Sequence, residues 1–206
     1  MLRNLNSLFG SVIYATDGEL GHVHDFLFDD RGWTIRYIVV ETGGWLSSRQ
    51  VLISPAAAGK PDWERRVVPV SLSMEQVRNS PDVDTATPVS LQEEIAMSQY
   101  YGWPAYWSMD PPLVPVIVPG QPVAAEGDPH LRSVREVVTY QVDAADGQLG
   151  EIDDLIIEDS NWFLRYLVVK TGGWLNEKQL LITTRSVGSI QWSRRQVVLA
   201  QAFDDM

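Results

Sequence analysis

An internal repeat constrains the fold of this chain more than any other feature of its sequence. Residues 17–53 recur without a gap at 146–182, at a constant offset of 129, and 19 of the 37 aligned pairs are identical. Most of the remaining pairs exchange similar residues, and a Trp-x-Arg-Arg pattern at 63–66 returns at 192–195. Agreement over this length predicts two copies of one small domain, each with its own core.

The repeat also predicts the domain boundaries. We expect a first domain at residues 1–80, a connector at 81–130 and a second domain at 131–206. Domains of this size have thin hydrophobic cores, so burial between the two copies should add to their stability.

Short strands dominate both copies. Asp17-Gly18 and Asp146-Gly147 suit the positive dihedral angles of tight hairpins. Aromatic and β-branched residues at 33–40 and 162–169 predict a buried strand, with Trp33, Ile35, Tyr37 and Val39 on one face. Five or six short strands joined by glycine turns predict an all-β fold with minor short helices, in which each copy is a small β-barrel.

The connector begins with helix signals and then changes character. Ser73-x-x-Gln76 and Ser90-x-x-Glu93 have capping-box spacing, which predicts short helices from 73 to 78 and from 90 to about 100. Five aromatic residues follow within 100–107, and six of the chain's 12 prolines lie within 110–129. This composition predicts an extended, stiffened arm.

The aromatic part of the connector is the candidate partner-binding segment. If exposed, its side chains would form an apolar patch of the order of several hundred Å², which soluble monomers seldom tolerate. They either pack on the chain's own barrels or dock onto another subunit or partner, and we expect a homodimer in preference to a monomer. The residues are Tyr100, Tyr101, Trp103, Tyr106 and Trp107.

The repeated motifs resemble those of the PRC-barrel family, the fold of the cytoplasmic domain of the photosynthetic reaction centre H subunit. The resemblance rests on Asp17-Gly18 with Leu20-Gly21, on the run from Trp33 to Val40, and on Gly44-Trp45-Leu46 before Val51-Leu52-Ile53. It covers about 8–80 and 131–200. The resemblance implies a small all-β barrel for each copy and an adaptor role that holds partners together, and it does not imply a catalytic centre.

One set of motif residues is shared by both copies and is expected to be structural. Arg36 and its counterpart Arg165 could bind an anionic ligand, but an arginine that packs its stem along the barrel wall and bonds a turn acid is the favoured reading. The aromatic members should occupy equivalent buried or half-buried positions. The set is Trp33, Arg36, Tyr37, Gly44, Trp45, Trp162, Arg165, Tyr166, Gly173 and Trp174.

Metal and cofactor sites are not expected. His22 and His24 lie two apart on a predicted strand, but the second copy has Glu151 and Asp153 there, and a third ligand is missing. The acid pairs at 29–30, 153–154 and 158–159 fall at turns or on alternating strand faces and lack the ligand spacing of a calcium loop.

Catalytic signatures are also missing. There is no cysteine, no nucleophile elbow and no phosphate-binding glycine loop, and His130 stands at the end of the connector. The net charge of -11 opposes direct binding of nucleic acid. The chain has neither a leader nor an 18-residue apolar run, so we expect a cytoplasmic protein that does not insert into membranes.

These observations favour a non-catalytic binding or assembly module with a protein partner. The alternative is a sensor of a small ligand or metal ion that uses the cleft between the barrels. A hydrolase-like enzyme is the least favoured reading.

Overall fold

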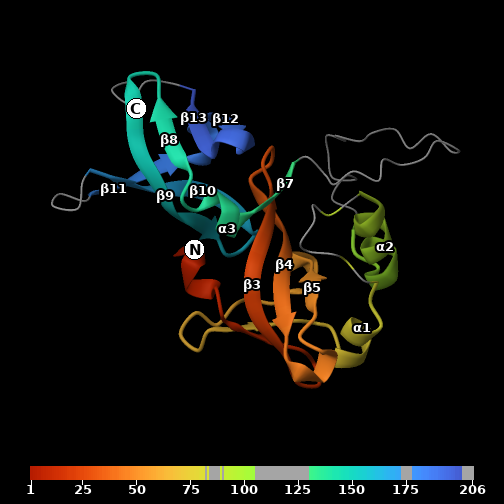
Figure 1. Cartoon of the computed structure of the whole chain (residues 1–206). Coiled ribbons are helices and arrows are strands. Elements are labelled where there is room, and N and C mark those ends of the chain that lie inside the picture. The colour runs from red at the N-terminus through yellow and green to blue at the C-terminus, as the bar shows by residue number, and fades with distance from the viewer. Residues whose placement is uncertain (82, 84–88, 90, 105–129, 173–177, 201–206) are drawn as a thin grey trace, which may run out of the picture.

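The computed structural model describes residues 1–81, 83, 89, 91–104, 130–172 and 178–200 (Figure 1). Strands dominate these residues and the helices are few and short, so the predicted all-β class is confirmed. No helix in this part of the chain combines the length and apolar character needed to cross a membrane.

The first repeat contains six strands and is followed by two helices. The strands are β1 (Leu2–Asn4), β2 (Val12–Tyr14), β3 (Glu19–Asp29), β4 (Thr34–Thr42), β5 (Gln50–Ile53) and β6 (Val67–Pro69). The helices are α1 (Met74–Arg78) and α2 (Leu91–Tyr101). The predicted capping box is present at α1, where the Ser73 hydroxyl accepts a hydrogen bond from the backbone N–H of Gln76.

The second repeat contains seven strands and one helical turn. They are β7 (Leu131–Ser133), β8 (Gln141–Ala144), β9 (Gly147–Glu158), β10 (Phe163–Thr171), β11 (Lys178–Thr183), β12 (Val187–Gln191), β13 (Gln196–Leu199) and α3 (Val134–Val137). Short 3-10 turns join the strands: η1 (Leu5–Leu8), η2 (Gly44–Leu46), η3 (Pro55–Ala57), η5 (Thr184–Ser186) and η6 (Trp192–Arg194).

The two repeats pair their strands in the same way. β3 and β4 form a long antiparallel hairpin, β2 and β5 lie on its two sides, and β6 runs parallel to β2. In the second repeat β9 and β10 form the hairpin, β8 and β11 flank it, and β13 runs parallel to β8. The similarity of the two sequences therefore extends to their strand order.

A β-bulge in each hairpin corrects one expectation from the sequence. The register between β3 and β4 shifts so that Phe28 pairs with Ile35 and Leu27 pairs with Tyr37, which leaves Arg36 as the extra residue. Side-chain alternation changes phase there. Ile35 points into the main core, whereas Tyr37 and Val39 point to the opposite face, so the prediction of one shared face is wrong.

The first strand of each repeat pairs with the other repeat. β1 is hydrogen-bonded to β9, with Leu2 opposite Glu158 and Asn4 opposite Ile156. β7 is hydrogen-bonded to β3, with Leu131 opposite Asp29 and Ser133 opposite Leu27. Adding 129 to the residue numbers in β1, and subtracting 129 from those of their partners in β9, gives the residue pairs of β7 and β3. The repeats are thus interlocked with approximate two-fold symmetry.

The two hairpins also meet at their turns. The N–H of Ile35 donates to the carbonyl of Trp162 at 2.9 Å, and the N–H of Leu164 donates to the carbonyl of Trp33 at 2.7 Å. Through these contacts and the exchanged strands, the thirteen strands of the described residues form one hydrogen-bonded sheet. The predicted domain boundaries and the division into two barrels stay predictions.

The main core is shared between the repeats. Phe26, Phe28 and Leu5 lie in the same cluster of buried side chains as Leu155, Ile157 and Val137. The separate core that we expected for each copy is therefore replaced by one continuous core. Burial between the copies is consistent with the small size of each repeat.

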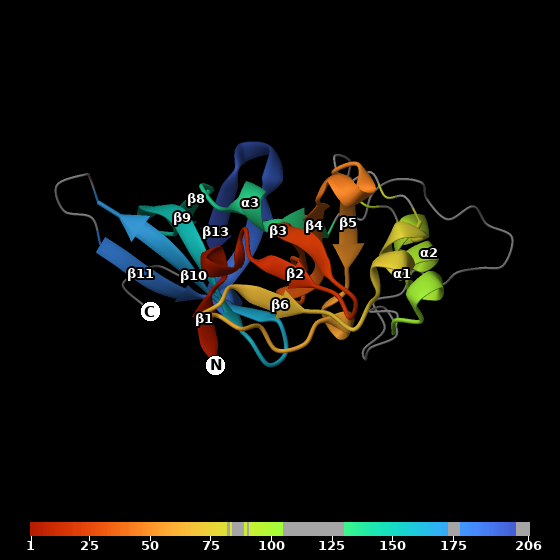
Figure 2. The ribbon, with the colours of Figure 1, turned by 90° about the horizontal axis from the view of Figure 1, so that it is seen from below.

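A second, smaller core lies under α2. Tyr37, Val39 and Leu52 on the outer face of β4 and β5 pack with Met97 of α2 and with Leu131. Figure 2 shows α1 and α2 beyond β5 at one end of the molecule and β11 at the other end.

Candidate functional site in the cleft between the repeats

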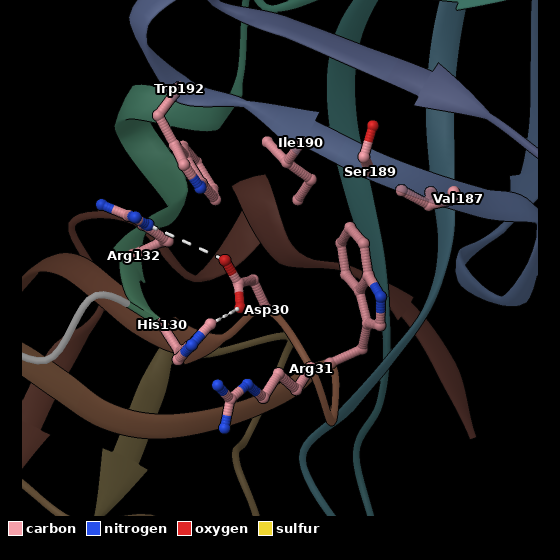
Figure 3. Close-up of a pocket in the computed structure, with 10 residues that line it drawn as sticks. Asp30, Arg31, His130, Arg132, Val187, Ser189, Ile190 and Trp192 are labelled. Atoms are coloured by element: carbon pink, nitrogen blue, oxygen red, sulfur yellow. Dashed lines mark hydrogen bonds and ion pairs between the residues drawn. The ribbon is translucent and has the colours of Figure 1, made fainter.

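A cleft lies where the two repeats meet. It has a volume of about 370 Å³, which is within the range of small-molecule sites. The turn between β3 and β4 supplies Asp30, Arg31 and Trp33, and the end of the connector and the second repeat supply the remaining lining (Figure 3). That remaining lining is His130, Arg132, Val187, Gly188, Ser189, Ile190 and Trp192.

Asp30 organises the polar side of this cleft. Its Oδ1 lies 2.8 Å from Nδ1 of His130, and its Oδ2 lies 3.8 Å from Nε of Arg132. Figure 3 shows the carboxylate between these two side chains. Burial raises the pKa of Asp30, and the hydrogen bond and charge of His130 oppose that rise.

The backbone and a tryptophan complete this arrangement. The N–H of Asp30 donates to the carbonyl of His130 at 3.0 Å. The guanidinium carbon of Arg132 lies 4.1 Å from the ring centre of Trp192, a separation suited to a cation–π contact. Asp30 therefore joins the turn of the first repeat to the start of the second.

The corresponding corner of the molecule repeats this geometry. The N–H of Asp159 donates to the carbonyl of Met1 at 2.9 Å. Arg3 lies over Trp63 at 5.5 Å, as Arg132 does over Trp192. At both junctions a turn aspartate bonds the start of the other repeat, next to an arginine that lies over a tryptophan.

The cleft has the chemistry to hold a small anion with a flat apolar body. Trp33, Ile190 and Trp192 offer apolar and aromatic surface, and Arg31 and Ser189 are further polar residues of the lining. His130 and Arg132 are already hydrogen-bonded or ion-paired with Asp30. Among the described residues no three histidine, aspartate or glutamate side chains converge as metal ligands would.

The predicted partner-binding aromatics lie elsewhere. Tyr101 and Trp103 stack with ring centres 4.2 Å apart and pack against the first repeat, and burial raises the pKa of Tyr101. Tyr100 is exposed, and its hydroxyl donates to the carbonyl of Gln76 at 2.9 Å. Tyr106 and Trp107 lie outside the described residues.

The aromatic motif residues are unevenly buried. Trp33 is half-buried and stacks on Phe28 with ring centres 5.5 Å apart, whereas Trp162 is buried. Tyr37 is buried, but its counterpart Tyr166 is half-buried. The two copies therefore share strand positions without sharing solvent exposure.

The other motif residues occupy turns or the bulges. Trp45 is half-buried and donates from Nε1 to the carbonyl of Leu20 at 2.9 Å. Gly44 begins the turn η2, and Gly173 and Trp174 lie outside the described residues. Arg36 and Arg165 are the bulge residues, and each bonds the acid at the end of the preceding strand, Asp29 or Glu158.

The histidine pair is dispersed among separate partners. His22 lies 3.9 Å from Glu19, and His24 lies 3.6 Å from Glu41.

The Asp29 carboxylate accepts hydrogen bonds from the backbone N–H groups of Arg31 and Gly32, as a turn-capping acid does.

The sequence suggested a cleft between the barrels as the site of an alternative sensor function, but it did not identify the residues that line the cleft, although the repeat contains their signal. Three pairs of residues at these junctions are identical at the same offset of 129: Arg3 with Arg132, Asp30 with Asp159, and Trp63 with Trp192. Only the exchange of β1 and β7 brings residues from different repeats together, so their contact could not be read from the repeat alone.

Comparison with known proteins agrees with the motifs of the first repeat. Residues 2–70 match the family model of the PRC-barrel domain. An "Uncharacterized protein" of Deinococcus radiodurans is 37% identical over 71 residues, which cover 34% of this chain and 25% of that protein. The matched segment therefore spans about a quarter of the relative's length. The resemblance of this chain to the PRC-barrel family is confirmed over residues 2–70.

Proposed function

We propose that this protein is a non-catalytic binding and assembly module of the cytoplasm, built from two PRC-type barrels. The observation that supports this proposal best is the duplicated junction. Asp30 beside Arg132 and Trp192, and Asp159 beside Arg3 and Trp63, occupy equivalent corners, and in each corner the aspartate joins the two repeats. A structural clamp accounts for the presence of the same groups at both corners of a symmetric fold.

The aromatic connector is part of the proposed partner surface. Tyr101 and Trp103 are packed on the first repeat, which leaves Tyr100 as the exposed member among the described residues. Tyr106 and Trp107 belong to the same proposed surface. Aromatic side chains of this kind are enriched at protein interfaces.

Affinity capture with chemical cross-linking in the native organism tests the assembly function. We expect a protein to be recovered at stoichiometric amount, with cross-links to lysine residues of this chain identified by mass spectrometry. Recovery of the chain alone, at several expression levels, would contradict the proposal.

A second candidate function is favoured by the cleft itself. The cleft combines aromatic walls with arginines at the junction of the repeats, which suits a sensor of a small aromatic or heterocyclic anion. Native mass spectrometry of the purified protein should then reveal bound mass that is lost in Arg31→Ala. Arg65→Ala is the matched control, because Arg65 is an exposed arginine outside this cleft. Equal bound mass in both variants would argue against a ligand in the cleft.

A further inference from the structure

The repeat provides an internal comparison for the outer face of the second repeat. α2 covers the outer face of β4 and β5, where Leu52 is 1% exposed, and Leu131 of β7 in the same cluster is 6% exposed. The equivalent residues of the second repeat are Leu181 on β11 and Leu2 on β1. Leu181 is 65% exposed and Leu2 is 54% exposed. The same sequence pattern thus gives a face that α2 covers in the first repeat and a face with exposed leucines in the second repeat.

The bulged arginines show the same difference. The Arg36 side chain is 4% exposed and contacts two carboxylates, Asp29 of its own hairpin and the fully buried Glu94 of α2. Arg165 has the equivalent hairpin acid, Glu158, and its side chain is 38% exposed. In the described residues it makes no ion pair with a helix.

The shape of the molecule agrees with this comparison. In Figure 2, α1 and α2 lie outside β5, while β11 lies at the opposite end with no described helix outside it. Tyr166 on β10, the counterpart of Tyr37, is half-buried on this face, whereas Val168, which pairs with Leu181 across the ladder, is buried. The open face therefore has an aromatic, aliphatic and cationic composition.

We propose that this face, formed by Leu2, Arg165, Tyr166 and Leu181, is a docking surface for an amphipathic helix of a partner protein. The helix carries a carboxylate that reaches Arg165 and aliphatic side chains that cover Leu181 and Leu2. The inference rests on the proposed assembly function and gives the class of partner.

Charge and burial favour a partner helix over a second copy of this chain. Glu94, the acid that α2 uses, is already buried against Arg36. In a face-to-face dimer neither copy would bring a helix to cover Leu181, because α2 of each copy is already packed on its own first repeat. A helix from another protein avoids this conflict and leaves the first repeat intact.

A synthetic peptide with the sequence of residues 89–103, labelled with a fluorophore and titrated into the full-length protein, tests the surface. We expect saturable binding, measured by anisotropy, that weakens at least about tenfold in Leu181→Asp and in Arg165→Glu. The matched control is Tyr14→Ser, which changes a residue 51% exposed on β2. A peptide carrying Glu94→Arg should restore binding to the Arg165→Glu variant.

Three results would overturn the inference. They are the absence of saturable binding, binding that is unchanged in Leu181→Asp, or a dimer by light scattering that Leu181→Asp converts to a monomer. Thermal melting shows whether the Leu181→Asp variant is folded. The milder Leu181→Ala variant repeats the binding test if it is not. If wild type and Leu181→Asp capture a partner equally well, this surface is not the docking site, although the assembly function is still supported. If neither captures a partner, the assembly function itself is contradicted.

Discussion

Two buried aspartates join the repeats at the scale of single residues. Asp25 accepts hydrogen bonds from the backbone N–H groups of Phe26, at 2.7 Å, and Arg135, at 3.1 Å. Asp154 accepts from Leu155 at 2.7 Å and from Asn6 at 3.0 Å. Each carboxylate thus bonds its own strand and the segment after the exchanged strand of the other repeat. Burial raises the pKa of both groups, although these hydrogen bonds oppose the rise.

The raised pKa values predict how stability depends on pH. An acid with a raised pKa in the folded state stabilises the protein most below its unfolded value near 3.8. That contribution is lost as the pH rises through the folded pKa. Asparagine keeps an acceptor oxygen and carries no charge. We therefore expect the Asp25→Asn/Asp154→Asn variant to gain stability relative to wild type as the pH rises from 4 to 7, measured by urea unfolding. A constant difference across this range would contradict the assignment.

Two glycines allow the paired strands to approach closely. Gly21 has φ of 151°, and a Cβ there would collide with the carbonyl oxygen of Glu41. Gly150 has φ of 158° and meets the carbonyl oxygen of Lys170 in the same way. We expect Gly21→Ala or Gly150→Ala to lower the free energy of unfolding by about 2–4 kcal/mol.

Gly44→Ala is the control for this prediction. No atom lies within 4 Å of a Cβ built at Gly44, so the change should stay within about 0.5 kcal/mol. Chemical denaturation of the three variants makes the comparison. Equal effects at Gly44 and Gly21 would show that close strand approach is not the cause.

At the scale of elements, the bulge at Arg36 determines how α2 is held. The extra residue turns the guanidinium to the outer face, where it meets the buried Glu94. Removing one partner of a buried ion pair leaves the other without compensation. We expect Glu94→Ala to cost about 3–5 kcal/mol and to release Tyr101 and Trp103 from their packing, seen as a red shift of tryptophan fluorescence.

The second repeat supplies the matched control for α2. Arg165→Ala removes the equivalent arginine, whose pair with Glu158 is partly exposed, so the loss should be far smaller than for Glu94→Ala. A cost for Glu94→Ala as small as that for Arg165→Ala would mean that the ion pair does not secure the helix.

At the scale of the whole molecule, the exchange of β1 and β7 links the two repeats through one hydrogen-bonded sheet. Each repeat lends a strand to the other, and the main core runs through both. We expect a chain cut by a specific protease at a site engineered within 105–129 to remain a single complex. Its two fragments should coelute on size exclusion and unfold in one transition.

A contrary result would be two separately eluting fragments that both keep native circular dichroism. That outcome would show that the two repeats are independently folded domains. Light scattering of the uncut chain tests the predicted homodimer at the same time, since the mass of the particle decides it.

Much of this architecture could be predicted from the sequence alone, because the interactions that form single strands, turns and helix caps are local. The strand-rich pattern at 33–40 led to β4, the capping box led to α1, and the motifs from Asp17-Gly18 to Ile53 led to the PRC-barrel resemblance over residues 2–70. Propensity, turn chemistry and capping act within a few residues, so they can be read in order along the chain.

The tertiary structure alone decided what the repeats share and where they differ. Nothing local distinguishes a first strand that pairs with its own hairpin from one that pairs with its neighbour's, so the clamp at Asp30 and the common core were not foreseen. The phase change at Arg36 depends on a bulge that period-two alternation cannot anticipate. Leu52 and Leu181 have equivalent places in the repeat, and only the packing of α2 buries one and leaves the other open.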